Sequence, residues 1–155
     1  MERGGLMEDK RLTAQSAMER LQPFVGKWKT EGTIQAPNGT DVRLDAIDTY
    51  EWLSGGFFLI HHVDGRMGED EVKAIEIIGF HEEDGMYVTT SYDNRGIVAN
   101  YKAQLHELEW TIIGSTERFR GSLGEDGRTL TGVWELAKEG GAEWKKWMDI
   151  RLTKY

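Results

Sequence analysis

The sequence predicts an all-β protein, an antiparallel barrel of roughly ten strands with one N-terminal helix. From Trp28 onward, apolar and polar residues alternate with period two between short turn signals. The chain has 19 glycines and only two prolines, so its turns are made by Gly, Asn and Asp. No long crossover helix follows Trp28, so neighbouring strands must be antiparallel. Closure into a barrel would remove the two free edges of such a sheet.

The N-terminal helix is predicted over residues 9–22, "DKRLTAQSAMERLQ". Asp9 is the expected cap and Pro23 ends the helix. The helical spacing i, i+3, i+4, i+7 is seen in Ala14, Ala17, Met18 and Leu21. Residues 1–8 are expected to form a flexible head, and residues 9–155 a single domain.

The remaining chain divides into strands separated by turn sequences such as "APNG", "HEEDG", "DNRG" and "GEDG". The segment 64–70, "DGRMGED", is expected to be a polar loop. The predicted strands are 28–35, 40–53, 57–63, 71–80, 86–92, 97–105, 108–115, 117–123, 128–136 and 143–154. In the last of these, alternation places Trp144 and Met148 on one face and Trp147 on the other.

Composition limits the classes of partner. A length of 155 residues is typical of one domain, and the absence of cysteine excludes disulfides and thiol chemistry. The 27 acidic residues outnumber the 19 basic ones, which gives a net charge of −8. This balance disfavours nucleic acid and anionic membrane surfaces as partners. The N-terminus has no signal-peptide core and no segment has the length of an apolar membrane span, so we expect a cytoplasmic protein.

The run "FVGKWK" carries a resemblance. A helix followed by Gly-x-Trp on the first strand resembles the calycin (lipocalin-like) group, which includes lipocalins and fatty-acid-binding proteins. The resemblance implies that Trp28 closes one end of the barrel and that Gly26 lets the backbone pass close by. It also implies a cation from the last strand packed over the tryptophan. Arg151 and Lys154 are both candidates, and they lie on opposite faces of that strand.

A second resemblance covers nearly the whole chain from Leu21. Six segments resemble, in order, a bacterial family of short calycin-like barrels that is a domain of unknown function and a distant relative of the haem-binding nitrobindins. This implies a ten-stranded barrel with an internal cavity and no particular activity. The nitrobindin-like relatives use a proximal histidine near the C-terminal end, whereas this chain has no histidine after His106. We therefore predict no cofactor and do not expect haem. The six segments are "LQPFVGKW", "LSGGFFL", "IEIIGFHEEDGMYV", "YDNRG", "ERFRGSLGEDGRTLTGVWEL" and "WKKWMDIRLTK".

Two adjacent histidines, His61 and His62, lie on one predicted strand. Adjacent residues of a strand point to opposite faces, so the two cannot chelate one metal ion together, and one of them should face the cavity. The flanking sequence "FFLIHHV" is apolar on both faces. Alternation therefore does not decide which histidine points inward.

Two carboxylates are candidate interior polar groups. Asp48 shares a predicted face with Tyr50 and Trp52, and Glu76 stands between Ala74 and Ile78. If they line the barrel, two carboxylates and a histidine could perform acid–base chemistry, as in an isomerase or cyclase that needs no cofactor. The alternative is that both are satisfied polar groups or face solvent.

The preferred function is non-enzymatic binding of a small apolar or aromatic molecule, because the chain has six tryptophans and lacks any complete catalytic motif. A homodimer is a further alternative, in which Phe58 and Trp147 would lie on the outer face. The predicted ligand-binding residues are Tyr50, Trp52, His61, His62, Tyr92, Trp134 and Met148.

Overall fold

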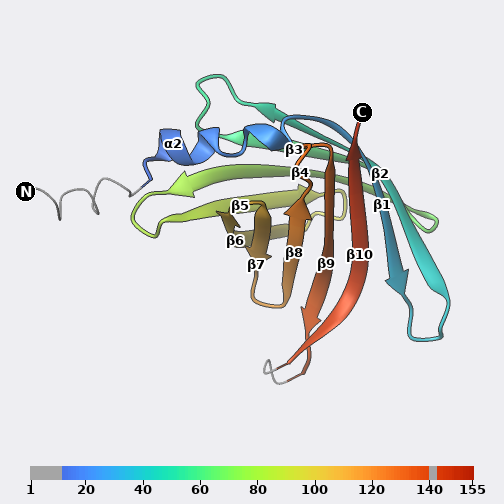
Figure 1. The fold of residues 1–155 in the computed structure, drawn as a ribbon. Coiled ribbons are helices and arrows are strands. Elements are labelled where there is room, and N and C mark those ends of the chain that lie inside the picture. The colour runs from blue at the N-terminus through green and yellow to red at the C-terminus, as the bar shows by residue number, and fades with distance from the viewer. Residues whose placement is uncertain (1–11, 140–142) are drawn as a thin grey trace, which may run out of the picture.

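The computed structural model describes residues 12–139 and 143–155 and forms a closed antiparallel barrel of ten strands (Figure 1). A short helix precedes the first strand, as the sequence predicts, and a 3-10 turn that was not predicted follows this helix. The elements are α2 (Ala14–Glu19), η1 (Gln22–Phe24), β1 (Gly26–Gln35), β2 (Asp41–Trp52), β3 (Leu59–Met67), β4 (Asp70–His81), β5 (Met86–Asp93), β6 (Val98–His106), β7 (Glu109–Ile113), β8 (Glu117–Leu123), β9 (Thr129–Ala137) and β10 (Trp144–Lys154).

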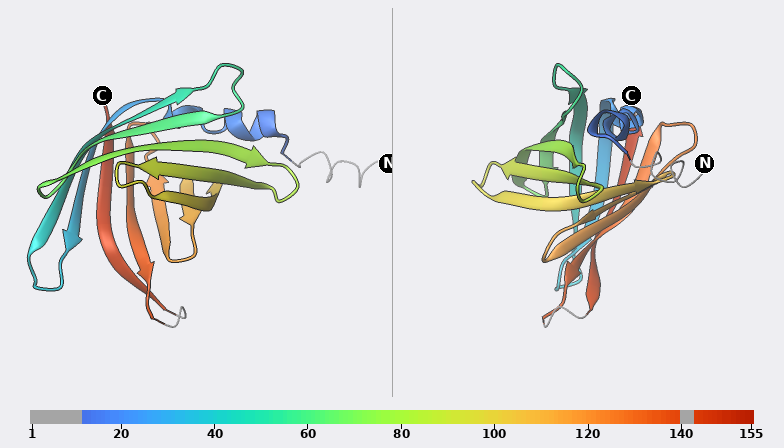
Figure 2. Two further views of the ribbon diagram at one scale, coloured as in Figure 1. Left: turned by 180° about the vertical axis from the view of Figure 1, so that it is seen from behind. Right: turned by 90° about the vertical axis from the view of Figure 1, so that its left-hand side faces the viewer.

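Each strand pairs with its neighbour in sequence, and β1 pairs with β10 to close the barrel (Figure 2). The closing register runs from Trp28 opposite Lys154 to Ile34 opposite Met148. Closure gives every strand an inner and an outer face, so residues of one parity are buried. On β2, for example, Ala46, Asp48 and Tyr50 are all buried.

The helix is shorter than predicted. It begins at Ala14, because Thr13 and Ser16 form a capping box in which the Thr13 Oγ1 accepts a hydrogen bond from the Ser16 N–H at 3.1 Å. It ends at Glu19, and η1 follows with Pro23 in its first turn. The predicted cap Asp9 and the predicted head 1–8 lie outside the described residues. No helix in the described ranges is long and apolar enough to cross a membrane.

The helix α2 lies across one end of the barrel and seals it (Figures 1 and 2). Its Ala17 and Met18 are fully buried against the inner core. The Tyr87 hydroxyl donates to the Ala17 carbonyl at 2.6 Å, and the Arg20 guanidinium donates to the Leu105 carbonyl at 2.9 Å. These two bonds tie the helix to β5 and β6.

The tryptophan of the Gly-x-Trp motif packs under this sealed end. Trp28 is fully buried, and its Nε1–H donates to the Phe24 carbonyl at 2.8 Å. Gly26 has a φ of 134°, a backbone conformation that residues with a Cβ rarely adopt. Lys154 supplies the cation: its Nζ lies 4.9 Å from the Trp28 ring centroid and donates to the Pro23 carbonyl at 2.8 Å. Arg151 is on the outer face and exposed.

The segment 64–70 is not the predicted loop. Strand β3 continues to Met67 and β4 starts at Asp70, so only Gly68 and Glu69 form the turn. Gly68 has a φ of 62°. The polar residues belong to the paired strands, where Asp64 stands opposite Lys73 and Arg66 opposite Glu71. Opposite charges on facing positions stabilise such a hairpin.

A register shift in β10 changes the faces predicted for its first half. The shift lies between Lys146 and Met148, so Trp144 does not share the inner face of Met148. Trp144 instead packs under Arg118, whose guanidinium lies 4.3 Å from the ring centroid. Trp147 packs against the inner cluster that contains Met148, whereas Phe58 is exposed. A homodimer stays a prediction.

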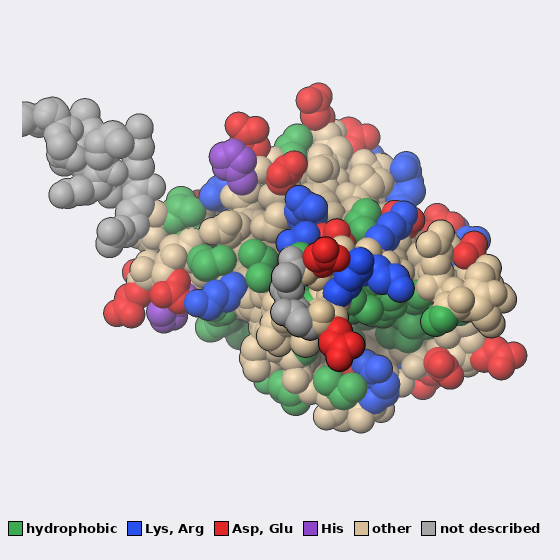
Figure 3. All heavy atoms as spheres, turned by 90° about the horizontal axis from the view of Figure 1, so that it is seen from below, with side chains coloured by type: hydrophobic (Ala, Val, Ile, Leu, Met, Phe, Trp, Pro, Cys, Tyr) green, Lys and Arg blue, Asp and Glu red, His purple; other side chains and the backbone are tan. Residues whose placement is uncertain are grey.

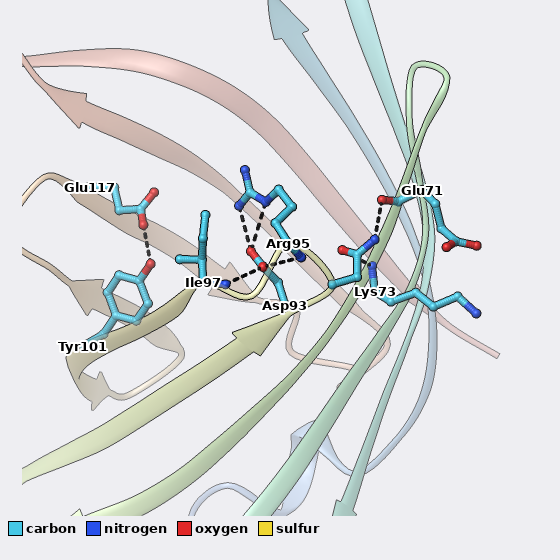
Figure 4. A network of polar contacts seen from close by, with 8 residues as sticks. Glu71, Lys73, Asp93, Arg95, Ile97, Tyr101 and Glu117 are labelled. Carbon is cyan, nitrogen blue, oxygen red and sulfur yellow. Dashed lines mark hydrogen bonds and ion pairs between the residues drawn. The ribbon is translucent and has the colours of Figure 1, made fainter.

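The turn between β5 and β6 is held by a polar network (Figure 4). The Asp93 carboxylate accepts the backbone N–H groups of Arg95 at 2.9 Å and Ile97 at 3.1 Å, and it pairs with the Arg95 guanidinium at 2.7 Å. The Asn94 side chain bonds to the backbone of Glu71 and Lys73 on β4. This network fixes the "DNRG" turn against the neighbouring hairpin.

The contact of Lys154 with Trp28 predicts a difference between two cations of β10. Lys154→Met should lower the free energy of unfolding by about 1–2 kcal/mol, because it removes a cation–π contact and a charge-assisted hydrogen bond. Arg151→Met, the matched change on the outer face, should cost less than about 0.5 kcal/mol. Urea unfolding of both variants measures the difference, and equal losses would contradict the assigned role of Lys154.

Candidate functional site

An internal cavity of about 240 Å³ lies inside the barrel. The layer next to α2 contains Phe24, Trp28 and Leu59, and a second apolar layer contains Ile34, Leu44 and Met148. The side chains of both layers are buried. The cavity is lined by residues from strands on opposite sides of the barrel. Viewed from the end away from α2, hydrophobic side chains lie deep between charged ones (Figure 3).

The cavity wall is divided by polarity. Its polar side chains come from β1 to β5 and are Thr30, Asp48, His61, Glu76 and Ser91. Apart from Tyr50 on β2, its large aromatic side chains come from β6 to β9 and are Tyr101, Trp110, Phe119 and Trp134. A molecule in the cavity would therefore meet polar groups on one side and aromatic rings on the other.

The structure brings together five of the residues singled out from the sequence. Asp48, Tyr50, His61, Glu76 and Trp134 all line the cavity. The open choice between the two histidines is thereby resolved, since His61 points inward. The sequence left open whether Asp48 and Glu76 face the interior or the solvent, and the structure places both in the interior.

The other predicted binding residues lie elsewhere. His62 and Tyr92 are on the outer wall, where His62 faces Glu51 at 3.4 Å and Tyr92 is 48% exposed. Trp52 lies beside the helical end, and its Nε1–H donates to the Gln22 side-chain oxygen at 3.0 Å. Met148 is buried in the second apolar layer. Strand parity accounts for His62 and Tyr92, since each follows an inward residue directly.

Strand register places the polar residues side by side. Tyr50 is opposite His61, His61 is opposite Glu76, and Glu76 is opposite Ser91, so four consecutive strands contribute one row of inward side chains. Asp48 is two residues before Tyr50 on β2, which makes it a diagonal neighbour of His61. This row forms because side chains alternate along each strand and because each hairpin has this register.

His61 bridges the two carboxylates. Its Nε2 lies 2.5 Å from Asp48 Oδ2, and its Nδ1 lies 2.8 Å from Glu76 Oε1. Both ring nitrogens donate when the imidazole is protonated, so the observed geometry suits an imidazolium between two carboxylates. The side chains of all three residues are mostly buried. The group carries a net charge of −1, because one cation stands against two anions.

Two neighbours fix this group in place. The Thr30 hydroxyl donates to Asp48 Oδ1 at 2.5 Å, so both oxygens of Asp48 are engaged. The Tyr50 ring stacks on the imidazole with ring centroids 4.0 Å apart and an angle of 10° between the planes. Thr30 was not among the predicted site residues, although the alternation of β1 places it on the face of Trp28.

The surroundings change the proton affinity of the histidine. Burial alone would lower the pKa of His61, but hydrogen bonds and charge attraction from Asp48 and Glu76 outweigh it and raise the pKa to about 9. Burial, together with the same two carboxylates, raises the pKa of the Tyr50 phenol well above its usual value. At neutral pH His61 is therefore charged and Tyr50 is neutral.

A carboxylate–phenol pair borders the cavity, and no sequence pattern pointed to it directly. The Tyr101 hydroxyl donates to a Glu117 carboxylate oxygen (Figure 4). Burial and this hydrogen bond raise the pKa of Tyr101. The pair joins residues of β6 and β8, which are not adjacent strands, and the Tyr101 ring lies over Gly114, which has no side chain, between them.

The described residues offer little for a metal ion or haem. No group of three or more His, Asp or Glu residues in the described ranges is arranged to hold a metal ion. His61 is the only histidine lining the cavity within these ranges, and both of its nitrogens are engaged by carboxylates. Axial ligation of haem iron requires a free donor over the porphyrin face. The cavity residues therefore do not fit haem ligation through an imidazole.

Comparison with known proteins identifies the family but no activity. Residues 13–151 match the family model described as a protein of unknown function (DUF1579), and the chain belongs to this family. No curated protein matches the chain. The crystal structure of Rv2717c from M. tuberculosis is similar in fold, with a TM-score of 0.65 and 12% identity over 90% of this chain and 97% of that one.

A designed protein was also found among the solved structures. It is a de novo designed, fluorescence-activating β-barrel with a TM-score of 0.47 and 10% identity, over 92% of this chain and 100% of the designed one. The comparison with Rv2717c supports the barrel fold alone, because the identity is low.

The bridged histidine predicts a pH dependence of stability. A pKa of about 9 in the folded protein exceeds the unfolded value of 6.5, so the contribution of His61 is complete below pH 6.5 and is lost as pH rises through 9. The free energy of unfolding should fall by about 3 kcal/mol over this window. Urea unfolding at several pH values, together with an NMR titration of the imidazole, measures it.

Matched histidine variants separate this effect from other titrations. In His61→Gln the fall between pH 6.5 and 9 should largely disappear, whereas His62→Gln, on the outer wall, should keep it. An imidazole of His61 that titrates near 6.5 would contradict the bridged arrangement, whatever the stability of the variants.

Proposed function

We propose that this member of the DUF1579 family binds a small apolar or aromatic molecule inside its barrel. The observation that carries the proposal is the cavity of about 240 Å³, walled by Tyr50, Tyr101, Trp110, Phe119 and Trp134 and by a few convergent polar groups. Small-molecule sites have this character, being concave, mostly apolar and supplied with a small number of placed polar groups.

The architecture supports binding in a second way. The end next to α2 is filled by the fully buried Met18, Leu21 and Trp28, so the cavity is backed by rigid packing. Its polar groups are held in advance by hydrogen bonds to one another rather than to a flexible loop. A preformed site of this kind loses little conformational entropy when a ligand enters.

Acid–base catalysis by the same residues is the weaker interpretation. Asp48, His61 and Glu76 do converge, as such a mechanism requires. A general base, however, needs a free lone pair and a pKa near the working pH. His61 has both nitrogens occupied and a pKa raised to about 9, so at neutral pH it is a tied cation. This arrangement suits a fixed electrostatic environment better than repeated proton transfer.

A cavity-filling variant tests the proposal. Ala74 lines the cavity, so Ala74→Phe should occupy ligand space and weaken binding by at least about tenfold, a loss of roughly 1.4 kcal/mol. The probes are three one-ring compounds of different charge: 2-phenylethylamine, 2-phenylethanol and 3-phenylpropanoate. Isothermal titration calorimetry measures their affinities, and saturation-transfer NMR reports contact with the protein.

The neighbouring residue provides the control. Ile75 is outward and 41% exposed, so Ile75→Phe adds a ring of the same kind outside the barrel and should leave binding unchanged. If none of the three probes binds the unaltered protein, the proposed function is wrong. Equal losses in both variants would place the binding outside the cavity.

Haem provides a separate prediction. Hemin added to the purified protein should give no sharp Soret band, because the one histidine lining the cavity in the described ranges is engaged by two carboxylates. His61→Ala should leave the absorption spectrum with hemin unchanged. A stoichiometric complex with a sharp band that disappears in His61→Ala would contradict this expectation.

A further inference from the structure

We propose that the molecule bound in the cavity carries a protonated amine on its aromatic or apolar body. This inference rests on the proposed function and specifies the chemical class of its ligand. It follows from the charge balance of the wall, from polar atoms that have no partner there, and from the position of the aromatic rings.

The charges of the cavity wall do not balance. Asp48 and Glu76 contribute two negative charges against the single positive charge of His61. Glu117 is outside the cavity lining and accepts a hydrogen bond from the neutral phenol of Tyr101, and no ion pair joins it to a Lys or Arg of the described residues. No Lys or Arg from the described ranges lines the cavity. The cavity is therefore anionic, in a protein interior where an uncompensated charge is costly.

Unpartnered polar atoms indicate where a cation would bind. Both oxygens of Asp48 are engaged, by Thr30 and His61, whereas Glu76 accepts only the His61 bond through Oε1. Its Oε2 has no hydrogen-bond partner among the described residues. The hydroxyl of Tyr50, a cavity-lining residue that is only 7% exposed, likewise has none in the described part of the chain. An ammonium group has three donors and no acceptor, which suits a carboxylate and a phenol oxygen.

The aromatic side of the cavity suits the remainder of such a molecule. Tyr101, Trp110 and Trp134 face the polar row across the barrel interior. Aromatic faces attract cations and pack against apolar rings, so they accommodate an arylalkylamine at either end. A carboxylate ligand would instead approach the negative Glu76, while both ring nitrogens of the charged His61 are already engaged by Asp48 and Glu76. A neutral ligand would leave the charge of the wall uncompensated.

Three probes that share a phenyl ring and differ in charge test the inference. At pH 7 and low ionic strength, 2-phenylethylamine should bind about tenfold more tightly than 2-phenylethanol, because a charge-assisted hydrogen bond is stronger than a neutral one. The anionic 3-phenylpropanoate should bind most weakly. Calorimetry on the unaltered protein gives this order without any variant.

Two carboxylate variants locate the effect. Glu76→Gln should lower the ratio of the amine affinity to the alcohol affinity from about tenfold to about twofold or less, whatever its effect on the two affinities separately. Glu51→Gln makes the same change in net charge on the outer wall, where Glu51 faces His62, and should preserve the preference. Circular dichroism confirms that both variants are folded before their affinities are compared.

The outcomes distinguish this inference from the proposed function. Binding of the amine and the alcohol with equal affinity, or tighter binding of the carboxylate, would overturn the inference and leave ligand binding in the cavity intact. A preference that survives Glu76→Gln would also overturn it. If none of the three probes binds, both proposals are wrong.

Discussion

The pairing of β1 with β10 is the constraint on which the rest of the structure depends. It joins the first strand to the last through the register from Trp28 opposite Lys154 to Ile34 opposite Met148. Because the barrel is closed, each strand has an inner face, and side-chain alternation decides what lies there. The same seam carries Trp28, which is held by the Phe24 carbonyl and by Lys154. The helix packs over Trp28, so the contacts that close the sheet also hold the helix that covers one end of the barrel.

Within that closed interior, the placement of charge is the unusual feature. Buried ion pairs generally stabilise a protein less than apolar side chains of the same volume would, because each charge must leave water. Here three charged side chains from β2, β3 and β4 share the cavity wall with five tyrosine, tryptophan and phenylalanine side chains. The hydrogen bonds that His61 makes to the two carboxylates reduce the free-energy cost of burying them, but one of the two negative charges stays uncompensated. A site that departs in this way from simple core packing is where function is expected.

Much of the fold could be predicted from the sequence, but the site only in part. Alternation and turn residues indicated the ten strands, and they placed Asp48 and Glu76 correctly as soon as the inner face was known. The choice between His61 and His62 could not be made, because exposed Phe58 packs over Gly79 and makes the outer face of this region apolar as well. No particular residue type in the sequence marks the register shift in β10. The row from Tyr50 to Ser91 depends on the register of the hairpins. The predicted loop 64–70 is longer than the observed turn, so it did not give the correct register between β3 and β4.

The same geometry supports the proposed ligand recognition over proton transfer by these residues. A histidine that moves protons must exchange partners, whereas His61 is held at both nitrogens and stacked on Tyr50. Its carboxylate neighbours are fixed in turn, Asp48 by Thr30 and Glu76 by His61 itself. The result is a rigid set of charges on one side of the cavity, facing aromatic rings on the other. A preorganised field acts on whatever charge a bound molecule brings, so under the proposed function the division of polarity across the barrel would set both the orientation of that molecule and the sign of charge that is favoured.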